Sequence, residues 1–273
     1  MSGNVKIVAV LCVLGLVTGF VVSGCSKPAE KPVKDPNAQV APVKGSTPTA
    51  EAPKGEAPKA EEPKPAAPEK PMKPGAPEPA IIHKCAAAPV IDGDLSDACW
   101  KNAEVKGIWA DIRTGKAADP QPKAFCCYDD RNLYVAFLNP EPNMDQIVAV
   151  VAERDGTVYE DDSNEVFLDP TAGKTIYLQF VVNTKGVIYD GKGKDADWNG
   201  NEKAAVKKMD KSWSLEISIP LADLGVEGSP KGQTWTANFC RNRLTGGDSE
   251  AIGWSDTGAS FHNPSAFGKL KFE

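Results

Sequence analysis

Short stretches in which apolar and polar residues alternate recur through residues 83–273, and they constrain the fold more than any other feature of the chain. Within residues 212–220 every second residue is apolar, namely Trp213, Leu215, Ile217 and Ile219. Successive side chains of a strand point to opposite faces, so this alternation is typical of a half-buried β-strand. No window in this part of the chain has a long helical period.

Further strands are predicted on both sides of turn-forming residues. Residues 129–132 predict the turn of a hairpin, and residues 183–186 predict a second one. Residues 220–225 are typical of a single helical turn closed by Gly225. The strands around these turns are expected at residues 124–128, 133–138, 146–152, 165–168, 176–182, 187–189, 234–241 and 268–272. Many short strands separated by turns predict an all-β fold, an antiparallel β-sandwich of the jelly-roll kind.

The first 25 residues carry a processing signal. Lys6 supplies a positive charge, residues 7–22 are mostly apolar, and small residues precede Cys25. This pattern is typical of a secretory signal peptide rather than of a membrane-spanning helix. The residues Val-Ser-Gly-Cys at 22–25 resemble a bacterial lipobox, which implies an exported lipoprotein anchored to the membrane through acyl chains on Cys25. By the same resemblance, Ser26 favours the outer membrane. The alternative is an ordinary signal peptide with an incidental cysteine.

A proline-rich segment follows the signal. Residues 26–80 hold 14 of the 23 prolines, together with Ala, Lys and Glu, and no aromatic residue. Such a segment cannot bury enough apolar surface to offset the entropy of ordering it. We therefore expect a disordered linker over residues 26–82, with an upper reach on the order of 170 Å at ~3.1 Å per residue.

Residues 83–273 are expected to form the single folded domain. All six tryptophans lie there, and Trp100, Trp213 and Trp235 are expected in its core. The formal net charge of −6 argues against nucleic acid as a partner, because nucleic-acid binding needs a basic patch. The length suits one β-sandwich.

Five cysteines follow the signal: Cys85, Cys99, Cys126, Cys127 and Cys240. In an exported domain one or two disulfides are expected, and the odd count leaves at least one thiol free. Cys126 and Cys127 are neighbours in a predicted strand, so they point to opposite faces and do not serve one site. Their spacing matches no zinc pattern, and the sequence leaves the disulfide pairing open.

The order of several motifs resembles one known family. These motifs are residues 90–95, Trp100, residues 129–136, 162–169 and 179–183, Trp213 with residues 216–220, residues 238–241, Trp254 with Ser255, and Pro264 with residues 267–268. On them the chain resembles a family 9 carbohydrate-binding module, within the broader class of DOMON-like sandwiches. The resemblance implies a glycan ligand held between two aromatic rings, with polar side chains bonding its hydroxyls.

The resemblance also implies site residues. Tyr159 and Phe261 stand where characterised members have tryptophans, and Glu165, Gln179 and Asn183 match polar positions of the family. Val181 stands where an arginine is expected, which removes a fork of hydrogen-bond donors.

Other residues of the chain are further candidates. Trp198 lies in a polar, glycine-rich loop and is a candidate third stacking surface, while Arg241 is expected either to reach the ligand or to pair with an acid, as is Arg243. The alternatives are that Tyr159 and Phe261 pack at the rim, and that acids at the strand edge are solvated or bind calcium.

The function expected on these grounds is non-catalytic carbohydrate binding by a monomeric, membrane-anchored, exported lipoprotein, with no cofactor other than a possible calcium ion. Two alternatives stay open. One is a structural or protein-interaction module of the cell envelope with a degenerate sugar site. The other is haem or redox binding, for which the available axial ligands are His83, His262, Met144 and Met209. An enzyme is not expected, because no catalytic motif is present and Asp162 and Glu165 would face opposite ways.

Overall fold

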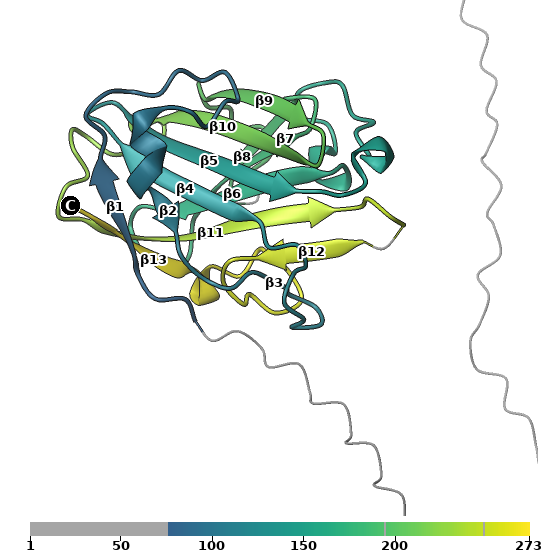
Figure 1. Ribbon diagram of the computed structural model, residues 1–273. Helices are drawn as coiled ribbons and strands as arrows, with labels where there is room; N and C mark the ends of the chain where they lie inside the picture. Colours follow the sequence, from purple (N-terminus) through teal and green to yellow (C-terminus); the bar gives the residue numbers. More distant parts are fainter. Residues whose placement is uncertain (1–75, 194, 248) are drawn as a thin grey trace, which may run out of the picture. The chain divides into compact units, whose positions relative to one another are not determined.

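Thirteen short strands in two layers make up the part of the chain that the computed structural model describes, residues 76–193, 195–247 and 249–273 (Figure 1). The strands follow one hydrogen-bonded path in the order β8-β7-β6-β11-β13-β1-β4-β5-β10-β9. The path folds over so that its two halves face each other. The all-β sandwich predicted from the alternation is confirmed.

The first layer comprises β8 (Ile188–Lys192), β7 (Leu178–Asn183), β6 (Ser163–Asp169), β11 (Thr234–Arg243) and β13 (Gly268–Phe272), with β12 (Glu250–Gly253) and β3 (Ala110–Asp111) beside β11. The second layer comprises β4 (Lys123–Tyr128), β5 (Asn132–Pro140), β10 (Ser212–Pro220) and β9 (Lys203–Met209), with β2 (Glu104–Val105) beside β4. Short 3-10 helices are η1 (Ala98–Asn102), η2 (Met144–Gln146), η3 (Val158–Glu160) and η4 (Pro264–Ala266).

Strand β1 (Ala80–Lys84) belongs to both layers. Its first part, Ala80 to Ile82, pairs with β13, and its last two residues pair with β4. Both pairings are parallel, whereas every other strand pairing in the described residues is antiparallel. The Ile82 side chain is fully buried. The folded part therefore includes Ala80, so it begins before residue 83, where the sequence placed the domain start.

The core lies between the two layers. Trp213, Leu215, Ile217 and Ile219 of β10 all point into it, as the alternation predicted, and Trp235 lies there too. The hairpins β4–β5 and β7–β8 form as expected, and residues 220–225 close a turn with Gly225 in the left-handed region at φ 71°. Trp100 is buried as expected, but in a smaller cluster on the outer face of the second layer.

The strand predicted at residues 146–152 is wrong. This stretch begins with the last residue of η2 and is otherwise irregular chain. Its backbone N–H groups at Val148, Val150 and Val151 donate to the carboxylates of Asp161 and Asp162 rather than to a neighbouring strand. The run of apolar residues has the composition of a strand, but side-chain oxygens take the place of the ladder partner.

A buried carboxylate fastens the chain before β2 to the second layer. Glu216 of β10 points away from the core and is fully buried beneath residues 92–100. Its oxygens accept hydrogen bonds from the backbone N–H of Asp92 (3.0 Å) and Gly93 (2.8 Å) and from the indole of Trp100 (2.7 Å). One side chain thus satisfies three donors that have no strand partner, at a position that alternation alone assigns to solvent.

Replacing this carboxylate should destabilise the fold. We expect Glu216→Ala to lower the free energy of unfolding by about 2–3 kcal/mol, because it leaves three donors unpaired in a buried place. Chemical denaturation followed by tryptophan fluorescence measures the loss. The matched control is Glu227→Ala at an exposed position, which should change stability by less than about 0.5 kcal/mol. Equal stability of the two variants would contradict the role given to Glu216.

Candidate functional site

A polar hollow lies on the outer face of the first layer. Strand alternation sends Val166, Phe180 and Phe239 into the core and turns Glu165, Gln179 and Asn242 outward, from three adjacent strands. The hollow has a volume of about 290 Å³ and is lined by Tyr159, Glu165, Gln179, Tyr189, Asn242 and His262. Three of the predicted site residues, Tyr159, Glu165 and Gln179, therefore come together there.

Glu165 is the central polar group of the hollow. Gln179 Nε2 donates to its Oε2 at 2.7 Å, and Asn242 Nδ2 donates to its Oε1 at 2.6 Å. Only 3% of the residue is exposed. Desolvation raises the pKa of this carboxyl above its usual value, and the two amide hydrogen bonds oppose the shift. Two amides thus hold the carboxylate in one orientation at the floor of an open depression.

Aromatic rings form the walls of the hollow. Tyr159, on η3, is 42% exposed and meets Tyr189 of β8 edge to face, with ring centroids 5.7 Å apart. His262 lies across the same hollow, and its Nδ1 is 2.7 Å from the hydroxyl of Tyr177. The depression therefore combines apolar ring surface with a fixed carboxylate.

Asn183 does not line the hollow, but it holds the segment that carries Tyr159. Its Nδ2 donates to Val151 O (3.1 Å) and to Asp161 Oδ2 (2.9 Å). Asp161 in turn accepts the N–H groups of Val150 and Val151. Asn183 is fully buried in this arrangement, so its contribution to the hollow is positional.

The structure places Phe261 outside the hollow. Its ring is 8% exposed and packs in a buried aromatic cluster with Phe167, Tyr177 and Phe267. Tyr159 and Phe261 were expected to hold the ligand between their rings. Instead Tyr159 lies beside Tyr189, and His262, the residue after Phe261, lines the hollow. The rim-packing alternative describes Phe261, while Tyr159 is exposed.

Trp198 lies toward the opposite face of the layer. It packs on the main core, its ring edge-on to Phe180 at 6.0 Å. Its loop is fixed from beneath by Asp190, which accepts from Gly200 N at 2.5 Å and from Arg154 at 2.9 Å. Glu202 pairs with the same guanidinium at 2.7 Å. Trp198 therefore cannot share a ligand with Glu165, which points out of the other face.

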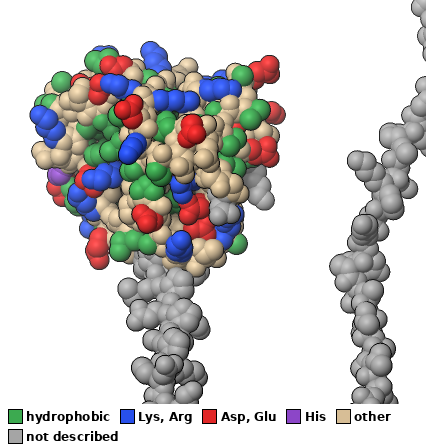
Figure 2. Space-filling view, turned by 45° about the vertical axis from the view of Figure 1, so that its right-hand side comes forward, with side chains coloured by type: hydrophobic (Ala, Val, Ile, Leu, Met, Phe, Trp, Pro, Cys, Tyr) green, Lys and Arg blue, Asp and Glu red, His purple; other side chains and the backbone are tan. Residues whose placement is uncertain are grey.

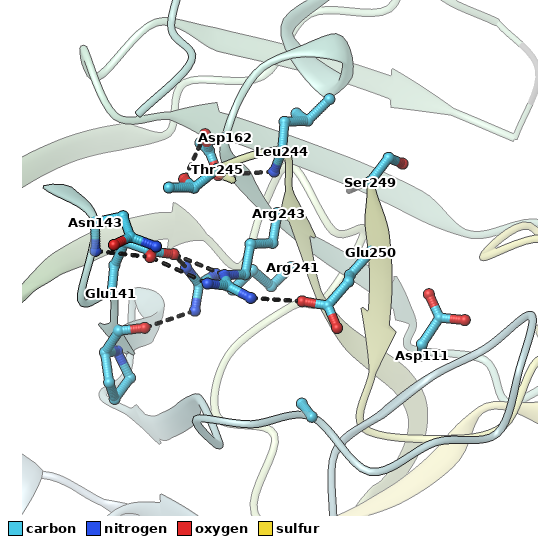
Figure 3. Close-up of polar contacts among 12 residues, drawn as sticks. Asp111, Glu141, Asn143, Asp162, Arg241, Arg243, Leu244, Thr245, Ser249 and Glu250 are labelled. Atoms are coloured by element: carbon cyan, nitrogen blue, oxygen red, sulfur yellow. Dashed lines mark hydrogen bonds and ion pairs between the residues drawn. The ribbon is translucent and has the colours of Figure 1, made fainter. Parts of the chain in front are cut away.

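Arg241 is part of a buried ion network (Figure 3). Its side chain is fully buried on the core side of β11 and donates to Pro140 O at 3.0 Å and to Glu141 at 2.9 Å. Glu141 also receives Arg243, which pairs with Glu250 at 2.8 Å. Of the two expectations for Arg241, pairing with an acid is the one that the structure shows.

Three lining residues were missed: Tyr189, Asn242 and His262. Asn242 and His262 each follow a residue that the sequence analysis chose, Arg241 and Phe261. Correct strand register would have found Asn242 on β11, whereas His262 lies in the loop before η4, where strand periodicity gives no guide. The β7–β8 hairpin could have predicted Tyr189. This residue pairs with Val181, and Val181 pairs with Glu165, so the three side chains lie on the same face of the layer. Val181 is fully buried where the family arginine was expected.

The candidate metal and haem ligands of the described residues do not converge on one site. Within residues 76–193, 195–247 and 249–273, no group of three His, Cys, Asp or Glu side chains is arranged to hold a metal ion. Asp162, one of the acids considered for calcium, is fully buried and accepts from Val148 N, Leu244 N and Thr245 Oγ1. His83 and His262, considered as haem ligands, line different hollows.

Comparison with known proteins identifies the family. Residues 91–273 match the family described as "Carbohydrate family 9 binding domain-like", so the chain belongs to this family. No curated protein sequence matches the chain.

Solved structures share the fold. A family 9 carbohydrate-binding module from Caldicellulosiruptor kristjanssonii in complex with cellotriose is 22% identical, with a TM-score of 0.55 over 72% of this chain and 94% of that one. The glucose complex of such a module from that organism gives 23% identity and a TM-score of 0.53, over 71% and 95% of the two chains. A carbohydrate-binding protein from Bacteroides uniformis, described as putative, is 20% identical, with a TM-score of 0.56 over 73% and 100%.

The buried acid beneath the Trp198 loop should make stability depend on pH. Burial raises the pKa of Asp190 to about 6, with repulsion from Glu202 adding to the shift and Gly200 N–H and Arg154 opposing it. The folded state thus holds a proton that the unfolded chain releases near pH 4. Stability from this group is full below about pH 4 and falls as pH rises through about 6, by up to about 3 kcal/mol.

Urea denaturation at pH 4.5 and 6.5 measures this dependence. Other acids also titrate in this window, so the quantity to compare is the change in unfolding free energy of the native chain against that of Asp190→Asn. The variant should lose less stability between the two pH values than the native chain does. An identical loss in both proteins would contradict the assignment to Asp190.

Proposed function

We propose that the protein is a non-catalytic carbohydrate-binding lipoprotein and that the hollow around Glu165 is its sugar site. The observation that carries the proposal is the fixed, desolvated carboxylate beside the exposed ring of Tyr159. The apolar face of a pyranose stacks on an aromatic plane, and each hydroxyl that leaves water needs a polar partner. The family membership and the sugar complexes of the similar structures support the same ligand class.

The carboxylate suits hydroxyl recognition. An ionised carboxyl offers about four acceptor positions, and the amides of Gln179 and Asn242 occupy one on each oxygen. The remaining positions are available to two sugar hydroxyls as donors. Since the two amides fix the orientation of Glu165 before the ligand arrives, little side-chain entropy is lost on binding.

The surface beside the hollow favours a chain of sugars over a single one. A second depression of about 600 Å³ shares His262 with the first and is lined further by Ile176, Tyr177 and Lys192. Ile176 is 57% exposed there. An oligosaccharide whose end lies at Glu165 can extend past His262 over this largely apolar surface.

The location at the cell envelope rests on the N-terminal residues. Cys25 and residues 26–75 of the predicted linker lie outside the described residues, so the anchor is a proposal from the lipobox, and lipidation of Cys25 would supply membrane attachment. No helix in the described part of the chain is long and apolar enough to cross a membrane. On the face in Figure 2, acidic and basic side chains are interspersed, so this face presents no patch of a single charge for a charged ligand. We propose that the protein acts as a monomer.

Removing the exposed ring should weaken sugar binding. We expect Tyr159→Ala to reduce affinity about tenfold or more, equivalent to ~1.4 kcal/mol, through loss of stacking. Isothermal titration against soluble oligosaccharides that include glucose and cellotriose provides the measurement. Ile108→Ala is the matched control, because it removes an exposed apolar side chain that does not line the hollow. If the native chain binds no glycan in the panel, or the two variants bind alike, the sugar site is not where we place it.

Removing the acylated cysteine should release the protein from the membrane. We expect Cys25→Ala to abolish incorporation of labelled fatty acid during expression in a bacterium and to shift the protein from the membrane to the soluble fraction. Immunoblotting of the separated inner and outer membranes shows where the native protein resides. Unchanged labelling of Cys25→Ala would contradict the anchor, whereas recovery of the native protein in the inner membrane would contradict only the outer-membrane location.

A further inference from the structure

Three cysteines meet on the outer face of the second layer, away from the sugar site. Cys127 lies on β4, Cys85 directly follows β1, and Cys99 lies on η1. They border a hollow of about 520 Å³ that His83 and Asp97 also line. Cys85 and Cys99 are partly exposed, whereas Cys127 is 2% exposed. These three side chains are called the thiol trio below.

Cys127 is the central member of the thiol trio. Its side chain belongs to a cluster against which both Cys85 and Cys99 pack, and all three line the same hollow. The Cys85 thiol further donates to Tyr128 O at 3.1 Å. Cys126, one residue earlier on β4, points into the main core as the strand period requires, and Cys240 lies on the other layer. The fold therefore separates the five cysteines of the described residues into one group of three and two isolated thiols.

We propose that the thiol trio is an oxidation site, at which one disulfide joins Cys127 to either Cys99 or Cys85 by exchange with a small disulfide such as oxidised glutathione. Among the described residues, no other cysteine side chain belongs to this cluster. All five cysteines of the described residues are free thiols. The inference does not depend on sugar binding.

The exchange proceeds in two balanced steps. The thiolate of Cys99 or Cys85, the partly exposed members, attacks one sulfur of oxidised glutathione; the S–S bond breaks and one glutathione leaves as a thiolate that takes up a proton. The deprotonated Cys127 then attacks the protein sulfur of this mixed disulfide and releases the second glutathione. The protein loses two hydrogens with two electrons, and these reduce one glutathione disulfide to two thiols.

The burial of the thiol trio should slow the exchange and should protect the finished disulfide from reduction. Burial raises the pKa of Cys99 to about 11 and also raises the pKa of Cys127. Burial and the charge of Asp129 raise the pKa of Cys85, against an opposing effect of Lys84. Little thiolate is present at neutral pH, and thiolate is the attacking species. Limited access would equally slow reduction of the finished bridge.

The third thiol gives the bridge two alternative positions. When Cys99 and Cys127 are joined, the Cys85 thiolate is beside Cys127 and can attack it, so that Cys99 leaves as a thiolate and takes up a proton. Either bridge ties the chain before β2 to β4. A cross-link of this kind should raise the melting temperature by about 5–10 °C.

Oxidation of the full chain with oxidised glutathione, followed by alkylation and trypsin digestion, tests the proposal. Cleavage after Lys84, Lys101, Lys123 and Arg131 places Cys85 and Cys99 in peptide 85–101 and Cys126 and Cys127 in peptide 124–131. We expect these two peptides to be recovered joined, with the fragment spectrum assigning Cys127 as one partner. A bridge between Cys85 and Cys99 alone, a stable glutathione adduct without a bridge, or no oxidation of the folded chain would overturn the proposal.

Variants separate the members of the thiol trio. Cys85→Ala and Cys99→Ala should each retain a bridge to Cys127, whereas the double variant should lose it and the rise in melting temperature with it. Cys126→Ala is the matched control on the same strand and should form the bridge like the native chain. Persistence of the joined peptides in the double variant would refute the assignment even if Cys127→Ala fails to fold.

Discussion

Buried carboxylates hold the irregular part of this sandwich, and the arrangement of its outer surface depends on them. Between β5 and β6 the chain has no ladder partner, and Asp161 and Asp162 accept its backbone N–H groups in place of one. Glu216 does the same on the other layer, for the chain before β2. Charged acceptors form the stronger hydrogen bonds, so a few acids suffice to fix long loops. The exposed ring of Tyr159 owes its position to this arrangement.

The regular part of the fold was predictable because it follows a period of two. Strands whose apolar residues alternate toward the core, such as β10 and those of the β4–β5 hairpin, were predicted close to their observed limits. The apolar run at residues 146–152 was misjudged for a physical reason: its hydrogen-bond partners are side chains that follow it in sequence, and periodicity carries no information about them. Strands β1, β2, β3, β9 and β12 were not predicted, since β9 is largely exposed and the other four are short.

The site was predictable to within one residue at two of its positions. Glu165, Gln179 and Tyr159, which the family resemblance implied as site residues, line the hollow, whereas Arg241 and Phe261 point elsewhere and their successors Asn242 and His262 line it. A shift of one residue exchanges the two faces of a strand, so an arginine that suits a ligand chemically becomes a buried structural cation. The residue types suggested which side chains could bind a ligand. The direction in which each side chain points decided which of them line the hollow.

The double membership of β1 has a mechanical consequence. A pull applied at the N-terminal side of Ala80 runs along this strand, whose hydrogen bonds to β13 and β4 lie across the direction of the force. Those bonds must slide together rather than open one at a time, and the fully buried Ile82 must leave the core in the same event. A force applied through an N-terminal tether would therefore act on β1, the strand that is hydrogen-bonded to both layers.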